Sequence, residues 1–360
     1  MQTEYANIVH RAQNYSGAMQ PILFIRGGET FHTFSQPDVE IPSPASFIWH
    51  LSLRKRIRLI ISPMTAELIV VPDSVLELAE NSVGAYFEGV AKQNRAATAR
   101  DHTDPGRAIK KGQLLETFTS LQGKKLLEIG SGFGTNLATW IKRYHLDGFG
   151  TERDTEGFSS SFKASRVLFA ANGLDPERII RVNGDTLPFE DASFDIVYAG
   201  NVLEHTEDPI KVLTEAVRVL RPGGIFHAEI PNFLSYFEGH YFVPQPPLFW
   251  RWVLPAWVRL LGRDPAYAYT LRTEINPMWC RRAVKQVNKL YPAKLISDGA
   301  EIFMNRLKQP FTFDMERTAS QLGILIRLIQ YLNFGNWVGR LIVLFQGHYP
   351  LYLTVRRESV

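Results

Sequence analysis

The sequence predicts a doubly wound α/β domain with a mostly parallel sheet, preceded by a segment of different character. Two observations lead to this fold class. From residue 113 onward, short apolar strand patterns alternate with helical patterns, which is typical of a parallel sheet covered by helices. The first of these strands also runs into a glycine-rich turn, LLEIGSGFGTN (126–136), before a helix begins. A turn of this kind lets the backbone approach a bound nucleotide closely.

The composition is that of a soluble globular protein. Of the 360 residues, 45% are hydrophobic and 21% are charged, which suffices for one large or two ordinary domains. The net charge of +4 is small, and no lysine and arginine stripe is long enough to follow a nucleic acid, so we expect no nucleic-acid partner. The single cysteine, Cys280, excludes an intrachain disulfide and a thiolate metal site, and we expect no metal.

Residues 1–112 are interpreted as an N-terminal extension, mainly β and then helical, whose role the sequence does not indicate. Its polar start lacks the apolar core of a signal peptide, which favours the cytoplasm. The segment ILFIRGGETFHTF (22–34) predicts a hairpin that turns at two glycines, and residues 46–62 predict a further strand. A helical pattern follows, and DHTDPGR (101–107) is typical of a linker.

The alternating part predicts five strands and the helices between them. A helix at 113–121 precedes the first strand, and the next helices are expected at 135–144, 157–173 and 208–220. The last of these has a good N-cap and first residue in Asp208 and Pro209. The predicted strands are KKLLEIG (124–130), LDGFGTE (146–152), RIIRVNG (178–184), FDIVYAGN (194–201) and GIFHAEIPN (224–232).

The spacing of the glycines distinguishes between nucleotide classes. The pattern is G-x-G-x-G, because Thr135 stands where a dinucleotide fingerprint needs glycine. The Gly-Lys-Ser/Thr ending of a Walker A loop is also missing. Glu152 ends the second strand, where an acidic side chain accepts hydrogen bonds from both ribose hydroxyls of an adenosine cofactor.

Four segments together resemble the class I S-adenosylmethionine-dependent methyltransferases, within the broad group that includes the ubiquinone-biosynthesis enzymes. In chain order they are LLEIGSGFGTNL, GFGTERD, NGDTLPFEDASFDIVYAGNVLEH and VRVLRPGGIFHAEIPN, about a third of the chain. The resemblance implies a seven-stranded Rossmann-like methyltransferase fold, with its domain at 113–241 and 271–357. It places the last two strands at 293–303 and 349–358, and implies S-adenosyl-L-methionine as cofactor.

The resemblance also implies roles for individual residues. Glu128 would order the amino end of the cofactor, and Glu152 would hold the ribose hydroxyls. Asp185, with Thr186 beside it, would flank the adenine, and Asn201 would lie next to the methionine moiety and its methyl group. The turn would pass under the methionine and ribose parts through the backbone of Gly130, Ser131, Gly132 and Gly134.

Alternatives to three of these roles stay open. Glu128 is equally read as a capping or network acid. Asp154, two residues after Glu152, would hold the ribose hydroxyls instead if the strand ends later. Asp185 is alternatively a turn residue that follows Gly184.

Two histidines are candidate bases for a hydroxyl acceptor, since methyl transfer to oxygen requires removal of a proton. His205 ends the motif NVLEH, and His240 lies in SYFEGHYF beyond the fifth strand, where the family builds its acceptor sites. Tyr236, Glu238 and Tyr241 are the candidate acceptor-binding residues beside it. This mixture favours a polar acceptor such as a sugar, a glycan or a similar small molecule, although an ordinary packed loop has the same composition.

Two apolar insertions, 242–270 and 309–345, predict a helical lid. Neither is suited to crossing a bilayer, since the apolar stretch in the first is too short and that in the second carries arginines and asparagines. A lipid- or isoprenoid-linked acceptor, with peripheral contact at the inner face of the membrane, is therefore the second functional hypothesis. A third is a non-catalytic interaction protein with the cofactor fold. The sequence indicates no oligomeric state.

Overall fold

The computed structural model divides into two compact units, Met1–Ala66 and Glu67–Val360. In the first unit, β1 (Gln20–Arg26) pairs antiparallel with β2 (Glu29–Ser35), which confirms the predicted hairpin. The strand predicted at 46–62 lies outside the described residues. The structure describes residues 20–26, 29–35, 68–153, 159–245, 251–308 and 335–359.

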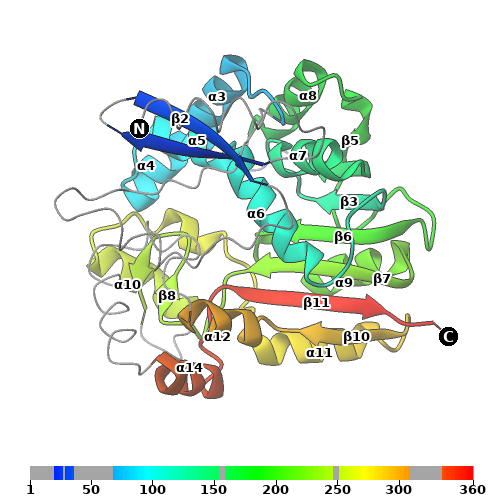
Figure 1. Cartoon of the computed structure of the whole chain (residues 1–360). Helices are drawn as coiled ribbons and strands as arrows, with labels where there is room; N and C mark the ends of the chain where they lie inside the picture. The colour runs from blue at the N-terminus through cyan, green and yellow to red at the C-terminus, as the bar shows by residue number, and fades with distance from the viewer. Residues whose placement is uncertain are drawn as a thin grey trace. The chain divides into compact units, whose positions relative to one another are not determined.

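A seven-stranded sheet forms the centre of the larger unit, with the strand order β10-β11-β7-β6-β3-β4-β5 (Figure 1). The pairs from β7 through β6, β3 and β4 to β5 are all parallel, and β11 alone runs antiparallel, between β7 and β10. The predicted doubly wound, mostly parallel fold is therefore confirmed. The strands are β3 (Lys125–Ile129), β4 (Asp147–Glu152), β5 (Ile179–Arg181), β6 (Phe194–Gly200), β7 (Leu220–Ile230), β10 (Ala293–Ser297) and β11 (Leu351–Arg357).

Helices pack on both faces of this sheet. Those before β3 are α3 (Asp73–Ala79), the π-helical η1 (Glu80–Gly84), α4 (Ala85–Ala91), α5 (Arg95–His102) and α6 (Pro105–Glu116). Those between the strands are α7 (Thr135–Tyr144), α8 (Ser161–Ala171), η2 (Pro176–Arg178), η3 (Leu203–His205) and α9 (Pro209–Val219). Those beyond β7 are η4 (Arg251–Val253), α10 (Leu254–Leu260), η5 (Ala266–Tyr269), α11 (Pro277–Val287), α12 (Ala300–Lys308) and α14 (Gly335–Leu344).

The central strands supply two separate cores, because successive side chains of a strand point to opposite faces. On β3, Leu127 and Ile129 are buried in the core that includes α9 and α11. Leu126 is buried in the other core, together with residues of α7 and α8. Glu128 therefore points to the face that α7 covers, which decides where its carboxylate can act.

The helices before β3 belong to the larger unit, whereas the sequence placed them in the extension that ends at 112. Their buried side chains share one core with α7, α8 and the sheet. A hydrogen bond reinforces this packing, since the Nε1–H of Trp140 on α7 donates to the carbonyl of Ala108 on α6 at 2.7 Å. The physical division lies after Ala66 because these helices bury their apolar faces against the sheet.

The linker predicted at 101–107 was wrong. Helix α5 continues to His102 and α6 already begins at Pro105. Asp104 caps α6, its side chain accepting a hydrogen bond from the backbone N–H of Gly106 at 2.8 Å. The Asp-Pro-Gly sequence is thus a helix start here, with proline at the first helical position where its missing N–H costs nothing.

Beyond β7, the chain adds a small third core. The short strands β8 (Phe237–Glu238) and β9 (Val243–Pro244) pair antiparallel, and side chains next to them pack with α10 and η5. Of the predicted lid, residues 242–245 and 251–270 are described, whereas most of 309–345 lies outside the described residues and only its end carries α14. In the part of the chain that the structure describes, no helix combines the length and apolar character needed to cross a membrane.

Candidate functional site

The predicted cofactor segments meet at the carboxyl ends of the central strands. Helix α7, which follows β3, packs on one face of the sheet, and α9, which follows η3 after β6, packs on the other. This reversal is the topological switch point at which doubly wound sheets bind ligands. The glycine turn 130–134, the end of β4 at Glu152, the turn at Asp185 and the turn at Asn201 all follow strands at this edge.

The three glycines of the turn have left-handed backbone conformations but different surroundings. Gly130, Gly132 and Gly134 have φ values of +66°, +55° and +79°. A Cβ added at Gly130 would meet Val202 at 2.5 Å, and one at Gly134 would meet Ser165 at 3.0 Å, whereas one at Gly132 would meet nothing within 4 Å. Gly130 and Gly134 are therefore needed for packing, and Gly132 leaves space beside the backbone.

Glu128 is a buried acid with one unpartnered oxygen. Its Oε1 accepts a hydrogen bond from the Nδ2 of Asn136 on α7 at 3.0 Å, while Oε2 has no hydrogen-bond partner. Burial raises the pKa of Glu128 to about 8. The hydroxyl of Ser131 is likewise buried without a partner. Since buried polar atoms are normally satisfied, these two atoms, at the end of β3 and in the glycine turn, suit a ligand that brings hydrogen-bonding groups.

The side chain of Glu152 contacts the same glycine turn. Its Oε2 accepts a hydrogen bond from the backbone N–H of Gly132 at 2.6 Å, and its Oε1 accepts one from the hydroxyl of Ser161 at 3.0 Å. The carboxylate is thereby held between the glycine turn and the start of α8. The alternative acid, Asp154, lies outside the described residues.

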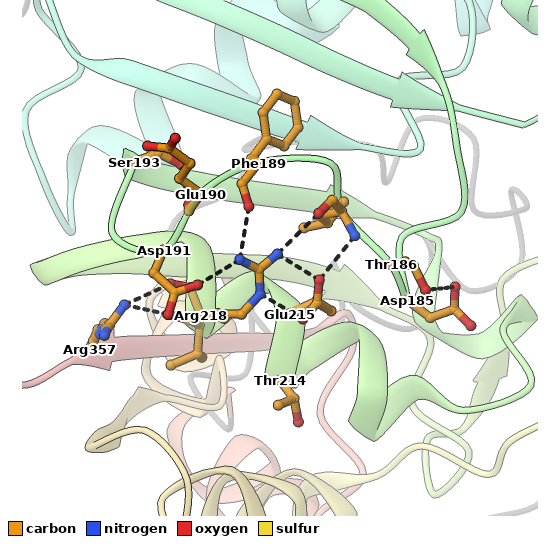
Figure 2. Close-up of polar contacts among 12 residues, drawn as sticks. Asp185, Thr186, Phe189, Glu190, Asp191, Ser193, Thr214, Glu215, Arg218 and Arg357 are labelled. Carbon is orange, nitrogen blue, oxygen red and sulfur yellow. Dashed lines mark hydrogen bonds and ion pairs between the residues drawn. The ribbon is translucent and has the colours of Figure 1, made fainter.

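An arginine that the sequence analysis did not identify fixes the turn after β5 (Figure 2). The Arg218 guanidinium on α9 donates to both carboxylate oxygens of Glu215 at 2.8 Å and to the carbonyls of Phe189 and Leu187 at 2.8 and 3.1 Å. The Arg218 guanidinium also holds the pKa of the Glu215 carboxyl below its usual range. This network anchors the end of the segment that carries Asp185.

Asp185 and Thr186 lie at the start of that segment, and both are accessible to solvent. Asp185 contacts the Thr186 hydroxyl at 3.5 Å and the Nζ of Lys211 at 3.7 Å. Gly184 brings the turn against β3, since a Cβ there would meet Ile129 at 2.6 Å. The turn that carries the pair therefore lies against the end of β3, and both side chains reach solvent.

Asn201 follows β6 in a left-handed conformation, with φ of +54°. Asparagine tolerates this region better than most residues. Its backbone N–H donates to the carbonyl of Glu229 at 2.8 Å, and its side chain is exposed. The turn thus directs the chain from the strand end into η3, which carries the next group of residues.

The two candidate bases lie together with two glutamates and a tyrosine. The Nδ1 of His240 contacts Glu238 Oε1 at 2.7 Å, and its Nε2 lies 3.7 Å from Glu204 Oε1. The Nε2 of His205 lies 3.8 Å from the same Glu204 oxygen and 2.9 Å from the Tyr267 hydroxyl. We call these five residues the histidine–glutamate cluster.

The two histidines of the cluster have different pKa values. Burial lowers the pKa of His240, but the carboxylates of Glu238 and Glu204 outweigh it and raise that pKa to about 9. Burial lowers the pKa of His205 to about 4. The His205 side chain is 30% exposed, whereas that of His240 is 10% exposed. With these pKa values, His240 is the protonated member at neutral pH and His205 is the neutral one, whose side chain also reaches solvent.

The predicted acceptor residues divide into supporting and accessible positions. Tyr241 is fully buried, and its hydroxyl accepts from the backbone N–H of Ala268 at 2.9 Å. Glu238 is buried too, with one oxygen toward His240 and the other accepting from the Tyr241 N–H at 2.6 Å. Tyr236 is half-buried. Glu204 and Tyr267 were not predicted as site residues, since neither has a local signal in the sequence that distinguishes it from core or surface.

Comparison with known proteins identifies the domain that carries this site. Residues 127–228 match the family model described as a methyltransferase domain. A Mycobacterium sp. (strain JLS) protein named as an uncharacterized methyltransferase is 34% identical over 161 residues, which cover 45% of this chain and 56% of that protein. A protein of the same description from Mycobacterium tuberculosis (strain ATCC 25177 / H37Ra) is 33% identical over 118 residues, 33% of this chain and 43% of that protein.

The chain spans about half the length of the curated relatives it matches. Among solved structures, the Haemonchus contortus phosphoethanolamine N-methyltransferase 2 in complex with S-adenosyl-L-methionine is similar with a TM-score of 0.42 and 15% identity. That similarity covers 71% of this chain and 53% of the other. The segment matched by the family model contains the glycine turn and the ends of β4 and β6. Residues 127–228 of this chain therefore match a methyltransferase domain, and the curated relatives that share this region are named as methyltransferases.

Proposed function

We propose that this protein transfers a methyl group from S-adenosyl-L-methionine to a hydroxyl of a small polar acceptor. The observation that carries the proposal is the open space beside Gly132, whose backbone contacts the buried carboxylate of Glu152, together with the buried acid Glu128 at the end of β3. A nucleoside with an amino acid attached has donors for both acids, in its ribose hydroxyls and its ammonium group.

The residues around the turn would hold the cofactor in three parts. Glu152 would accept from the ribose hydroxyls, and the unpartnered Oε2 of Glu128 would accept from the amino end. Asp185 and Thr186 would flank the adenine from the turn after β5, with Asn201 near the methionine moiety. When bound, the cofactor supplies a sulfonium methyl group as the electrophile. The chain has to hold the acceptor in line and remove its proton.

The acceptor side of the proposed site is the histidine–glutamate cluster, because η3 follows the strand end at Asn201 directly. His205 would receive the proton of the acceptor hydroxyl, since its neutral ring is the accessible member of the pair. His240 would act through its neighbours, held by Glu238 at 2.7 Å. A sugar or similar polyol suits this arrangement of carboxylates, imidazoles and a phenol.

Calorimetric titration tests the cofactor assignment. We expect S-adenosyl-L-methionine and S-adenosyl-L-homocysteine each to bind with one equivalent per chain and a Kd on the order of micromolar, in the range of ordinary substrates. NAD is the control and should not bind, because its pyrophosphate needs a glycine where Thr135 stands. A chain that binds NAD, or neither sulfur compound, would contradict the proposal.

A lipid-linked acceptor is the second candidate, and exposed apolar side chains beyond β7 favour it. Trp252, Leu260 and Tyr269 are 75%, 76% and 66% exposed, on or beside α10 and η5. Such a group of side chains suits the surface of a membrane.

Vesicle flotation checks this second candidate. If it holds, the protein floats with anionic vesicles, and Leu260→Asp reduces the bound fraction several-fold because it puts a charge into the apolar contact. Leu290→Asp is the matched control, since that leucine is 69% exposed but lies after α11. A protein that stays wholly in the soluble fraction would leave the polar acceptor as the only candidate.

A further inference from the structure

The histidine–glutamate cluster contains a group of ligand atoms that the proposed methyl transfer does not account for. One carboxylate oxygen of Glu204 and ring nitrogens of His205 and His240 all lie within 4.8 Å of one another. Glu204 is fully buried, and neither of its carboxylate oxygens has a hydrogen-bond partner. The charged neighbour of this carboxylate is the His240 ring at 3.7 Å, and a divalent ion that replaces the proton of that ring would supply the direct bond that the buried oxygens lack.

We propose that Glu204, His205 and His240 bind a divalent first-row transition metal ion, for which Zn²⁺ is the model. Two imidazoles and one carboxylate are a ligand set that zinc and non-haem iron both accept, with positions left open for another ligand. The proposal goes beyond the methyltransferase assignment and does not depend on it.

The distances suit such an ion once the three ligand atoms, which lie within 4.8 Å of one another, move closer together. Zinc bonds nitrogen and oxygen at about 2.0–2.2 Å, so adjacent ligand atoms in a tetrahedral site lie about 3.3 Å apart. The Glu204 oxygen lies 3.8 Å from His205 Nε2 and 3.7 Å from His240 Nε2. His205 would exchange its hydrogen bond with Tyr267, 2.9 Å away, for the metal bond.

The surroundings also resemble those of known metal ligands. A histidine that binds a metal through one ring nitrogen usually donates from the other to a carboxylate, which fixes its orientation. His240 has this partner, because its Nδ1 lies 2.7 Å from Glu238 and its Nε2 is left facing Glu204. A divalent ion with two carboxylates and two neutral imidazoles sums to zero charge, so the buried cluster would be compensated.

The ion would give the acceptor site a Lewis acid. A metal at this position would hold an acceptor oxygen and lower the pKa of its hydroxyl, and the proton would then pass to water instead of to His205, which would be a metal ligand. No local spacing in the sequence indicates the site, since His240 lies far along the chain from the Glu204–His205 pair and joins it only in the fold.

Metal binding to the untagged full-length protein tests the inference without any methyl transfer. The protein is first dialysed against a chelator and then titrated with Co²⁺, followed by its visible absorption, and with Zn²⁺ in competition. We expect one equivalent per chain. Glu204→Gln and His205→Gln should each weaken binding roughly tenfold or more, and Glu238→Gln about 10–100-fold as the outer partner of His240. His145→Gln, at an exposed histidine outside the cluster, should change nothing.

Two outcomes would overturn the site. One is a wild-type protein that binds neither ion more tightly than about 100 μM, weaker than structural or catalytic zinc by orders of magnitude. The other is binding that survives Glu204→Gln and His205→Gln unchanged, which would place the ion elsewhere. Circular dichroism of each variant shows that it is folded, and binding of S-adenosyl-L-methionine measured in parallel keeps a failure of the cofactor assignment distinct.

Discussion

Replacing Gly132 by leucine is expected to weaken the binding of S-adenosyl-L-methionine at least about 100-fold, equivalent to about 2.7 kcal/mol, while leaving the protein folded. The structure gives the reason. A side chain at this position meets no protein atom within 4 Å of its Cβ, so the folded protein can accommodate the leucine without a steric clash. That room is the space that we assign to the cofactor, and the leucine would occupy it.

The matched control is Gly173→Leu. Gly173 also has a left-handed backbone, with φ of +65°, and an added Cβ there also meets nothing within 4 Å. It follows the C-terminal end of α8, whereas the site borders the N-terminal end of that helix at Ser161. Both variants should lose about 1–2 kcal/mol of folding free energy, because leucine is strained in this conformation.

Calorimetry and thermal unfolding of the two variants together show whether a loss of cofactor binding comes from the filled space or from a loss of stability. Equal losses of stability with a loss of cofactor binding only in Gly132→Leu are the expected pattern. If Gly132→Leu binds the cofactor as the wild type does, the space beside this glycine is not the site. If both variants lose binding equally, the effect comes from the fold rather than from the turn.

The strands and the glycine turn could be predicted because their signals are local. Apolar runs of strand length, helical periodicity between them and glycines at a strand end each report on a few neighbouring residues. The start of α9 was predictable for the same reason, and the structure shows Asp208 accepting from the N–H groups of Ile210 and Lys211 at 3.1 and 3.0 Å.

The domain boundary and the linker were not predictable in this way. Asp-Pro-Gly starts a helix as readily as it forms a turn, and only the packing of α6 on Trp140 decides between them. The N-terminal helices were assigned to the extension because nothing in their own pattern reveals that their apolar faces are buried against the sheet.

Several residues of the candidate site could not be predicted from local sequence patterns either. Arg218 and Asn136 lie on helices with no motif around them, and their importance comes from partners on other elements. Glu204 stands beside a residue that was singled out, yet the fold alone brings His240 to 3.7 Å from Glu204 and Tyr267 to 2.9 Å from His205. A single sequence shows neither long-range contact.

Replacing Glu152 by glutamine is expected to weaken cofactor binding about 10–150-fold, since hydrogen bonds to a charged group contribute about 1.5–3 kcal/mol. Glutamine keeps the size of the side chain and one oxygen, so the contact with the Gly132 N–H at 2.6 Å has a replacement. What it loses is the charged acceptor that we assign to the ribose hydroxyls.

A thermodynamic cycle separates this role from simple support of the turn. The wild type and Glu152→Gln are each titrated with S-adenosyl-L-homocysteine and with its 3′-deoxy analogue. If the carboxylate binds the ribose, removing the hydroxyl weakens binding to the wild type but changes little in Glu152→Gln, so the two losses are not additive. Ser161→Ala, which removes the hydroxyl 3.0 Å from Glu152 without changing charge, is the control and should not alter the effect of the analogue.

Additive losses would mean that Glu152 acts on the cofactor through the Gly132 backbone and that another residue holds the ribose. Asp154 is the alternative that the sequence offers, and Asp154→Asn in the same cycle distinguishes the two acids. Coupling between the hydroxyl and Asp154 alone would move the role there, whereas coupling with Glu152 alone would place the ribose at the end of β4. Since the carboxylate of Glu152 already contacts the glycine turn, we expect the second result.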